Sequence, residues 1–517
     1  MSDPQAPADQ LDLLATHAAS QPDKTALIRG DQSLTYKQLH EAANRAANAL
    51  LGLGVQPGDR AAGMGFNSLE GHVLGGGLRR AGGIGVPINY RLRSSELAYV
   101  LNDSAARVIW AGPEHVAVVE EARSEVNGER SYIALEGEVP SGWLSYDALL
   151  AEAGDAPPGV ALAGIGASMI YTSGTTGHPK GAFRPAGAPI EAILDIIATF
   201  ELTRDEVHLL CGPGYHSAVS FFSSLTALMG GTVVIQKKFE AREALELIAR
   251  HGVTNTFMAP TLLQRLTDAY EELDLKPDLS TLKAIILGAA PCPYALKERA
   301  TAAFGEVLWE FYGATETGVN LVLRPEDQLR KPGSCGKPTP KHEIKLLDDD
   351  GNEVAVGEPG TLWVRNEVLA EYHNRPDATA ASTRPDGFFT VGDVAYRDDE
   401  GYYFICDRKI DMIISGGVNI YPAEIEAVLH AHPGVLDAAV IGVPDDQWGE
   451  SVKAVVMKRP GHEVGEAELV EFCASRLAGY KKPRSVDFVD DLPRDAAGKL
   501  LKRLIRAPYW EGAGRTI

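Results

Sequence analysis

Cysteine is scarce in this sequence, and long apolar runs are absent. Five cysteines occur among 517 residues, an odd number, and no two of them form a C-x-x-C pair. Such a pattern fits neither a disulfide framework nor a zinc site and is typical of a reducing compartment. The longest nearly uncharged apolar stretch, residues 221–235, is short for a bilayer span and contains Gly230 and Gly231. We therefore expect a cytoplasmic protein without integral membrane association.

Positive charge is scarce too. Lysine and arginine number 49 against 70 acidic side chains, and the formal net charge is −21. This balance disfavours a general electrostatic affinity for nucleic acid or for anionic lipid. An anionic substrate must therefore be held by local cationic groups and by backbone N–H donors. We expect small-molecule partners and no nucleic acid, and the sequence leaves open whether the chain forms a homodimer.

The remaining composition, 45% apolar and 23% charged, is that of a globular protein. The chain is too long for one ordinary core. Up to about Cys406, short apolar stretches alternate with helix-length amphipathic ones, which predicts layered α/β subdomains. Strands are expected at residues 60–66, 84–88, 207–211, 232–235, 253–258 and 284–287, and a helix at residues 69–81.

Two features divide the chain. Residues 153–166 are rich in glycine, proline and alanine and predict a connection between subdomains. Beyond Asp407 the pattern becomes α+β, with amphipathic helices around Ile425 and Phe472 and strands at residues 438–443 and 451–457. We predict a large N-terminal α/β domain over residues 1–406 and a small α+β C-terminal domain over residues 412–517.

The most informative segment reads Thr172-Ser-Gly-Thr-Thr-Gly-His-Pro-Lys180-Gly181. Glycines let backbone N–H groups turn inward, hydroxyl groups donate hydrogen bonds, and Lys180 adds a positive charge, so this loop can wrap an anion. The spacing of a Walker A loop is absent. For a generic loop of this composition, an ordinary strand-to-helix connection would be an equal alternative.

Further segments follow in order, and each alone has a plain structural alternative such as a polar loop histidine, a tight turn, a helix start or a solvated lysine. They are Tyr215-His216-Ser217, Leu287-Gly-Ala-Ala-Pro291, Glu310-Phe-Tyr-Gly-Ala-Thr-Glu-Thr317, Gly392-Asp393, and residues 407–426 and 493–499.

Together and in this order, the segments resemble the adenylate-forming superfamily of acyl- and aryl-CoA synthetases, luciferase-like enzymes and peptide-synthetase adenylation domains. The Thr172 loop matches the signature TSGTTG-x-PKG, residues 310–317 resemble the YG-x-TE block, and Lys499 ends a P-x-x-x-x-GK block. The chain is identified as a member of the acyl-CoA synthetase branch. The resemblance implies an acid–thiol ligase that uses ATP, Mg²⁺ and coenzyme A and forms an acyl-adenylate.

For ATP, the resemblance implies that Tyr312 stacks on adenine, Thr315 donates to a phosphate and Asp393 binds the ribose. Glu316 is an oxygen ligand of the kind that Mg²⁺ prefers. Val391 replaces the usual threonine of the Asp393 motif, so a role for that hydroxyl group is not carried over. The residues implied for ATP or AMP are Thr172, Ser173, Gly174, Thr175, Thr176, Gly177, Lys180, Gly288, Ala289, Ala290, Pro291, Glu310, Phe311, Tyr312, Gly313, Ala314, Thr315, Asp393, Arg408 and Lys499.

The resemblance further implies that His216 orients the acyl carboxylate and that Lys499 stabilises the charge that spreads over phosphate oxygens. The catalytic set is Lys499, His216, Glu316, Thr172 and Lys180.

After adenylation, the small domain of this family rotates about a hinge, which the resemblance places at residues 407–411. The pivot would be at Lys409, Ile410 and Asp411, with Ile410 where Asp or Lys is common. In the rotated state the domain would contact coenzyme A, with an aromatic ring and a cation at its nucleotide end. These contacts are Ser415, Gly416, Gly417, Trp448 and Lys481. For Lys481 a solvated loop is an equal alternative.

The carboxylic acid is the least determined partner. The expected acyl pocket consists of His216, Phe221, Phe222, Gly288, Gly313, Gly318 and Val319. We interpret the glycines as room for a bulky or long chain, which favours a medium- or long-chain fatty acid, with an aryl or polycyclic, steroid-type acid next. Three other functions stay open: an acyl-AMP ligase that loads a carrier protein, a nucleotide- or acyl-binding sensor without turnover, and a peripheral fatty-acid uptake protein that traps lipid by acylating it, although the sequence shows no basic amphipathic anchor.

Overall fold

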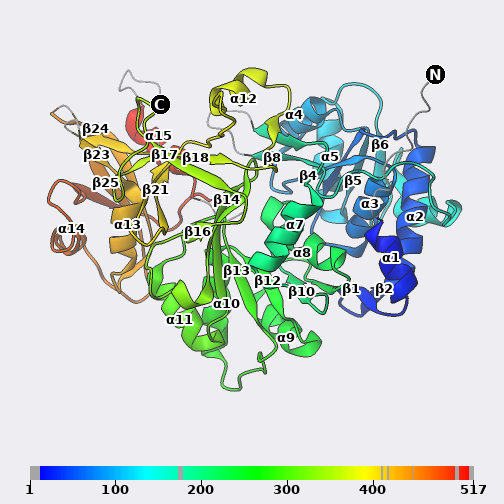
Figure 1. Ribbon diagram of the computed structural model, residues 1–517, viewed down its shortest axis with the longest axis horizontal. Helices are drawn as coiled ribbons and strands as arrows, with labels where there is room; N and C mark the ends of the chain where they lie inside the picture. Colours follow the sequence, from blue (N-terminus) through cyan, green and yellow to red (C-terminus); the bar gives the residue numbers. More distant parts are fainter. Residues whose placement is uncertain are drawn as a thin grey trace.

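The structure, a computed structural model, describes residues 12–172, 179–408, 411–415, 418–445, 447–494 and 500–511, apart from the side chain of Arg408. A large N-terminal domain contains two large α/β sheets and a small sheet, and a smaller α+β domain follows it (Figure 1). The C-terminal domain, in orange and red, lies at the opposite end of the molecule from the blue N-terminal helices. This architecture confirms the predicted fold class.

The first large sheet has eight strands in the order β19-β9-β8-β4-β3-β5-β6-β7. Strands β4, β3, β5 and β6 pair in parallel, whereas β8, β9 and β19 form an antiparallel edge. Helices between parallel strands cover the faces of such a sheet. The strands are β3 (Arg60–Met64), β4 (Ile84–Ile88), β5 (Val108–Ala111), β6 (Ser131–Ala134), β7 (Leu144–Ser145), β8 (Ser168–Thr172), β9 (Lys180–Arg184) and β19 (Glu371–Tyr372), with helices α4 (Ser94–Ser104), α5 (Val116–Arg123) and α6 (Tyr146–Glu152).

The second large sheet has nine strands in the order β16-β15-β14-β13-β12-β10-β11-β1-β2. Strands β14 to β1 in this order run parallel, so the carboxyl ends of β10, β13 and β14 meet at one edge. Ligands bind at this edge in open α/β sheets. The elements are α1 (Leu13–Ser20), β1 (Thr25–Arg29), β2 (Gln32–Thr35), α7 (Ile190–Thr199), β10 (Val207–Leu210), α8 (Ser217–Leu228), β11 (Thr232–Ile235), α9 (Ala241–His251), β12 (Asn255–Met258), α10 (Pro260–Glu272), β13 (Ala284–Leu287), α11 (Tyr294–Phe304), β14 (Leu308–Ala314), β15 (Gly318–Leu323) and β16 (Lys337–Pro338).

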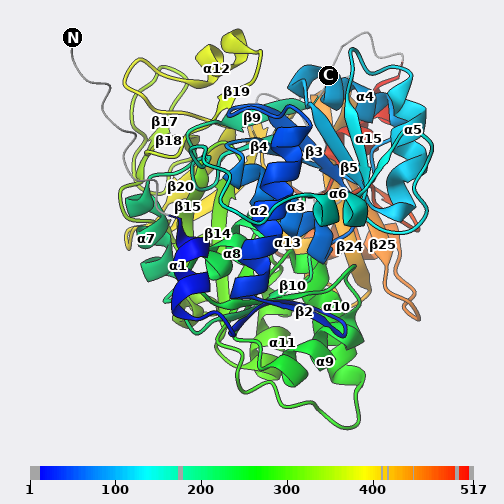
Figure 2. The same ribbon diagram turned by 90° about the vertical axis from the view of Figure 1, so that its right-hand side faces the viewer.

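One hydrophobic core joins side chains of both large sheets with those of α2 (Tyr36–Gly52), α3 (Leu69–Arg80) and α8. Helices α2 and α3 lie side by side (Figure 2). Helix α3 contains four glycines, a residue type that disfavours helices. Gly77 permits the close packing of α2, because an added Cβ would lie 2.4 Å from the Cβ of Ala46 and 2.9 Å from backbone atoms. At Gly75 an added Cβ would meet no atom within 4 Å. Packing against α2 therefore offsets the low helix propensity of this segment.

The small antiparallel sheet contains β17 (Glu343–Leu347), β18 (Gly360–Arg365), β20 (Asp393–Arg397) and β21 (Tyr403–Arg408), with α12 (Pro376–Ser382) nearby in sequence. Two short strands of the same part of the chain, β16 and β19, pair with the two large sheets instead. These pairings attach the small sheet to both large ones and place Asp393, the first residue of β20, near them.

The C-terminal domain has a five-stranded sheet and its own hydrophobic core. The predicted helices around Ile425 and Phe472 are present, and the two predicted strands are longer than expected. The elements are β22 (Ile413–Ser415), β23 (Val418–Ile420), α13 (Pro422–His430), β24 (Val435–Asp445), β25 (Gly449–Lys458), α14 (Glu466–Ala474), β26 (Ser485–Phe488) and α15 (Lys502–Trp510).

The interpretation of residues 153–166 as a connection between subdomains is wrong. They follow α6 and lead to β8, and β7 before α6 belongs to the same eight-stranded sheet as β8. The stretch is held by α2, where Arg45 donates to the carbonyl of Ala153 and Asn48 to the carbonyls of Gly154 and Ala156. Side chains that bind exposed carbonyls replace the hydrogen bonds of regular structure.

In the described ranges, no helix is long and apolar enough to cross a membrane.

The two glycines of α3 predict opposite effects of the same substitution. Gly77→Ala should lower the melting temperature, because overpacking against α2 typically costs about 1–3 kcal/mol. Gly75→Ala should leave it unchanged or raise it, because alanine stabilises a helix by about 0.5–1 kcal/mol relative to glycine. Thermal unfolding followed by circular dichroism measures both. Equal melting temperatures for the two variants would contradict the packing at Gly77.

Candidate active site

A continuous cavity of about 2540 Å³ lies where the second large sheet, the β8–β9 hairpin and the C-terminal domain face one another. Predicted site residues that line it are Thr172, Lys180, His216, Phe221, Ala289, Ala290, Pro291, Glu310, Phe311, Tyr312, Gly313, Ala314, Thr315, Glu316, Gly318, Val319, Asp393, Asp411 and Lys481. Predicted residues away from its lining are Phe222, Gly288, Ser415 and Trp448. Residues Ser173, Gly174, Thr175, Thr176, Gly177, Lys409, Ile410, Gly416, Gly417 and Lys499 lie outside the described residues, as does the side chain of Arg408.

Three distant segments meet at the carboxylate of Glu316. Thr172 and Lys180 are direct partners across the β8–β9 hairpin, so the two ends of the glycine-rich segment lie together. The hydroxyl group of Thr172 donates to Oε1 of Glu316 at 3.3 Å, and the hydroxyl group of Tyr372 donates to the same oxygen at 3.1 Å. The ammonium group of Lys180 lies 5.0 Å from the centre of the Tyr372 ring. The hairpin, the turn after β14 and the edge strand β19 are thus joined through one buried carboxylate.

The surroundings of Glu316 suit a Mg²⁺ ion that arrives with a nucleotide. Both hydroxyl groups donate to Oε1, and Oε2 accepts no hydrogen bond from the described residues. Mg²⁺ commonly binds through one or two carboxylates together with phosphate oxygens and water. Among the described residues there is no group of three or more His, Cys, Asp or Glu side chains that could hold a metal. One carboxylate with an available oxygen fits a Mg²⁺ ion that is bound mainly by phosphate oxygens and water, and not one held by protein ligands alone.

Arg184, at the end of β9, holds the turn that carries Glu316. Its guanidinium group donates to the carbonyl of Val368 at 2.8 Å and to the carbonyl of Thr315 at 3.2 Å. Burial lowers the pKa of Arg184, and the negative charge of Glu316 opposes this shift. The sequence prediction missed both Arg184 and Tyr372, because a single arginine or tyrosine outside a motif carries no spacing signal.

Tyr312 and Asp393 come from different sheets and form a short hydrogen bond. The hydroxyl group of Tyr312 donates to Oδ2 of Asp393 at 2.5 Å. Thr390, close to the threonine position that Val391 occupies, donates instead to the carbonyl of Leu362 at 2.7 Å. Its hydroxyl group therefore does not replace the one missing at Val391.

The carboxylate of Glu310 is committed to an ion pair. It binds the ammonium group of Lys297 on α11, and both side chains are almost fully buried. Burial disfavours the charged form of Lys297, but the carboxylate of Glu310 outweighs this and raises the pKa of Lys297. The pair links α11 to β14 and both residues line the cavity, so Glu310 contributes to the cavity wall while its charge is already balanced.

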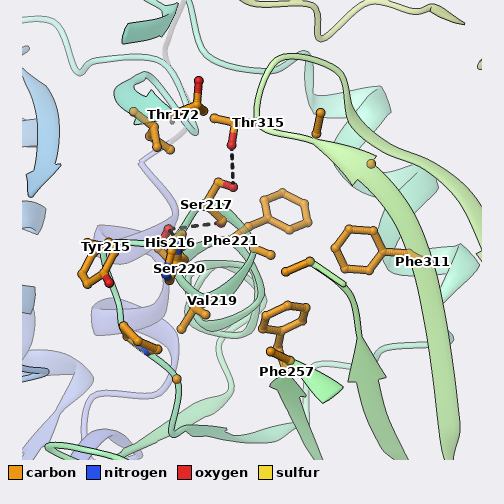
Figure 3. Close-up of a pocket in the computed structure, with 18 of the residues that line it drawn as sticks. Thr172, Tyr215, His216, Ser217, Val219, Ser220, Phe221, Phe257, Phe311 and Thr315 are labelled. Carbon is orange, nitrogen blue, oxygen red and sulfur yellow. Dashed lines mark hydrogen bonds between the residues drawn. The ribbon is translucent and has the colours of Figure 1, made fainter. Parts of the chain in front are cut away.

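Helix α8 begins beside the Glu316 turn. The hydroxyl groups of Ser217 and Thr315 are 3.2 Å apart and hydrogen-bonded (Figure 3). His216 is the N-cap residue of α8, and its ring lies 4.4 Å from the ring of Tyr215 between centroids. The positive end of the helix dipole therefore lies next to the turn at Thr315, and the His216 ring lines the same cavity beside Tyr215, an arrangement that suits an anionic group.

Aromatic rings form the apolar wall on the other side of α8. Phe221, Phe257 and Phe311 group there and line the cavity (Figure 3). Phe222 is 1% exposed and stacks on Phe257 at 5.8 Å, so it supports this wall from behind and does not line the pocket as expected. Successive helical residues point about 100° apart, and here Phe221 faces the cavity while Phe222 points into the core.

The glycines in this wall do not provide the room that we inferred from them. An added Cβ on Gly288 would lie 2.9 Å from the ring of Phe311, and one on Gly313 would lie 2.0 Å from the carbonyl oxygen of Gly318. These glycines allow close approach of ring and backbone to backbone. The glycine argument for a large acyl group is therefore wrong at these positions.

Two residues expected to contact coenzyme A have other partners here. The ammonium group of Lys481 lies 2.7 Å from a carboxylate oxygen of Glu424. Trp448 is 38% exposed, and the guanidinium group of Arg484 lies 5.0 Å from the centre of its ring.

The junction of the two domains contains a buried ion cluster. Asp407, near the end of β21, accepts a hydrogen bond from the backbone N–H of Ala423 at 3.2 Å and lies 3.2 Å from the ammonium group of Lys502. Lys502 is also 3.0 Å from Glu426. One carboxylate at the end of the small sheet is thereby bound to both α13 and α15 of the C-terminal domain.

Family comparisons cover most of the chain. A model of the AMP-binding enzyme family matches residues 14–372, and a model of the AMP-binding enzyme C-terminal domain matches residues 424–499. A fatty acid–[acyl-carrier-protein] ligase, ScoC, of Streptomyces coeruleorubidus is 34% identical over 97% of this chain and 96% of its own length. A feruloyl-CoA synthase of an Amycolatopsis species is 39% identical over 95% and 97%. The long-chain-fatty-acid–CoA ligase FadD13 of Mycobacterium tuberculosis is 37% identical over 93% and 94%.

Two solved structures of one protein, MatB from Rhodopseudomonas palustris, are informative together. Each is 31% identical to this chain and covers 97% of it and 99% of MatB. The ATP-bound form has a TM-score of 0.86, and the apo form has 0.75. The structure of the present chain is therefore more similar to the ATP-bound form than to the apo form. The chain belongs to the AMP-binding enzyme family of adenylate-forming enzymes, in its acyl-CoA synthetase branch.

Proposed function

We propose that this enzyme, an AMP-forming acid–CoA ligase, joins a carboxylic acid to coenzyme A in two steps. First, a carboxylate oxygen attacks the α-phosphorus of ATP, and the bond from this phosphorus to the oxygen of the β-phosphate breaks. Pyrophosphate departs, and the acyl-adenylate remains in the site. Second, the thiol of coenzyme A loses its proton and attacks the acyl carbonyl carbon, and AMP departs. The observation that carries the proposal is the convergence of Glu316, Lys180, Asp393 and His216 on one cavity.

In the first step these groups would place two anions against each other. Tyr312 and Asp393 would hold the nucleoside, while Thr172 and Lys180 would bind the phosphates. Glu316 would hold Mg²⁺, which neutralises phosphate charge when bound. Positioning and electrostatic stabilisation are the main sources of rate in such transfers, and loss of one preorganised donor typically costs about 10²–10³ in rate.

The acyl carboxylate would lie beside His216 and the N-terminus of α8. The hydrogen bond between Ser217 and Thr315 keeps this helix end next to the Glu316 turn. A carboxylate there would be attracted by the helix N-terminus and would be close to the phosphates that it must attack.

Lys499 would complete the first step from the C-terminal domain. The residues that flank its segment, Arg494 and Leu500, pair in a β-bridge and line the cavity, as does Lys502.

We propose that residues 1–406 form the N-terminal domain, residues 407–411 a hinge, and residues 412–517 a mobile C-terminal domain. The closer likeness to the ATP-bound form of MatB supports an arrangement for adenylation, from which the domain would rotate to admit coenzyme A.

Our first candidate for the acid is a medium- or long-chain fatty acid. Beyond His216, the cavity extends along α3, where His72, Gly75 and Arg79 line it, and faces Ser224 of α8 and Ile196 of α7. Gly75 leaves open space in this arm. From the start of α3 to its last turn, such an arm would be roughly 16 Å long at 1.5 Å per residue, enough for an extended alkyl chain.

A second candidate is an aryl acid. The rings of Phe221, Phe257 and Phe311 form a wall on which an aromatic acyl group could pack edge-to-face or offset-stacked (Figure 3). The feruloyl-CoA synthase among the relatives also supports this candidate.

The proposed reaction is tested by pyrophosphate release from a panel of alkyl and aryl acids, with and without coenzyme A. We expect acid-dependent pyrophosphate release and acyl-CoA formation. Thioester formation only on a phosphopantetheinylated carrier protein would favour the carrier-loading alternative suggested by ScoC. Nucleotide binding without pyrophosphate release would overturn the proposal in favour of a sensor.

Lys499→Ala should separate the two steps. Adenylation should fall by at least about 10²-fold, because the charge on the reacting phosphates loses a donor. Conversion of chemically prepared acyl-adenylate to acyl-CoA should change little, since Lys499 would leave the site when the domain rotates. Single-turnover assays of each step measure this. Equal loss in both steps would contradict the two-conformation assignment.

Gly75→Leu should shorten the arm along α3. Activity with hexadecanoate should fall by about tenfold or more, since an extended chain would lose its apolar contacts at roughly 1 kcal/mol per methylene, whereas activity with octanoate or ferulate should be retained. Gly52→Leu is the matched control, because Gly52 ends α2 with no atom within 4 Å of an added Cβ and lies away from the cavity. Unchanged discrimination between hexadecanoate and octanoate would exclude this route for the chain.

A further inference from the structure

Tyr372 lies in a strand whose backbone is held on both sides. The two residues of β19 pair with β9, in a register that places Tyr372 opposite Ala182. The N–H group of Tyr372 donates to the hydroxyl group of Thr379 at 3.0 Å, and the next N–H, of His373, donates to the carbonyl of Gly181 at 2.8 Å. The position of this side chain is therefore set by two separate parts of the chain.

The side chain of Tyr372 contacts two of the groups proposed for adenylation. Its hydroxyl group donates to Oε1 of Glu316 at 3.1 Å, the oxygen that also accepts from Thr172 at 3.3 Å. Its ring faces the ammonium group of Lys180, 5.0 Å from the ring centre. One tyrosine thus contacts both a carboxylate and a cation that lie 136 positions apart in the sequence, at residues 180 and 316.

We propose that Tyr372 is a positioning residue for the adenylation centre, an inference that rests on the proposed function. Two hydroxyl donors on Oε1 hold the Glu316 carboxylate in one orientation, and its other oxygen is then directed to a cation bound with ATP. Such outer partners orient a metal-binding carboxylate, and their removal typically costs about 10- to 100-fold in metal affinity or activity. The ring also keeps the Lys180 ammonium group beside the same phosphates.

A purely structural role for Tyr372 makes a different prediction. The ring lies 6.1 Å from that of Phe389 between centroids, and it could simply stabilise the attachment of β19. Loss of the hydroxyl group alone would then lower stability and affect ATP and the acid alike. The test therefore measures metal binding and the two substrates separately.

Tyr372→Phe in the full-length protein removes the hydroxyl group and keeps the ring. We expect kcat/KM for Mg·ATP to fall by about 10- to 100-fold, with an unchanged KM for the acid and an unchanged melting temperature. Mn²⁺ affinity in the complex with α,β-methylene-ATP, measured by electron paramagnetic resonance, should fall by a similar factor. In Tyr372→Leu, kcat/KM for Mg·ATP should fall further, because this variant also removes the ring that Lys180 contacts.

Tyr270→Phe is the matched control. Tyr270 also has a lysine over its ring, with the Lys276 ammonium group at 4.8 Å, and it lies away from the cavity. This variant should match the wild type in Mn²⁺ affinity and in kcat/KM for Mg·ATP.

A double-mutant cycle with Glu316→Gln decides whether Tyr372 acts through Glu316. In that background, Tyr372→Phe should cost no more than about twofold, because the carboxylate that it orients is already lost. The same loss in both backgrounds, or an unchanged Mn²⁺ affinity in Tyr372→Phe, would overturn the inference. Absence of pyrophosphate release from the wild type with every acid would overturn the proposed function instead, and the Mn²⁺ titration would still decide the role of Tyr372.

Discussion

Three chain segments meet at the carboxylate of Glu316, and their contacts with it set the geometry of the site. The β8–β9 hairpin brings Thr172 and Lys180 together, and Glu316 lies in the turn between the paired strands β14 and β15. Tyr372 comes from β19, which is much later in the sequence and pairs with β9. Each segment is held by backbone pairing in a sheet. The side chains are therefore held close together in advance, which is what the proposed adenylation would require.

In an acidic chain, the position of each lysine and arginine near a site for anionic substrates is important. With a net charge of −21, the chain as a whole does not attract anions, and attraction has to be local. The structure separates three uses of positive charge. Lys297 is balanced by the carboxylate of Glu310 in the cavity wall, and this pair links α11 to β14. Lys180 faces the cavity over an aromatic ring, and Lys502 ties the domain junction to Asp407.

Glycines shape the molecule in two opposite ways. At Gly77 and Gly313 the missing side chain lets backbone approach its neighbours closely, and any added atom would overlap them. At Gly75 the missing side chain leaves space along α3 inside the cavity. The distinction bears on the proposed acyl pocket, because the open space lies along α3 and not at the glycines beside Phe311.

The sequence by itself determined the layered α/β architecture, the strands on which the motifs lie and the family, because periodicity and motif spacing are properties of contiguous residues. It could not determine which of Phe221 and Phe222 faces the cavity. It also could not determine that residues 153–166 lie along α2 and lead to β8, a strand of the same sheet as β7. Nor could it single out Tyr372, whose contacts with Lys180 and Glu316 join remote parts of the chain. Such contacts depend on strand order and packing between sheets, and only the tertiary structure decides them.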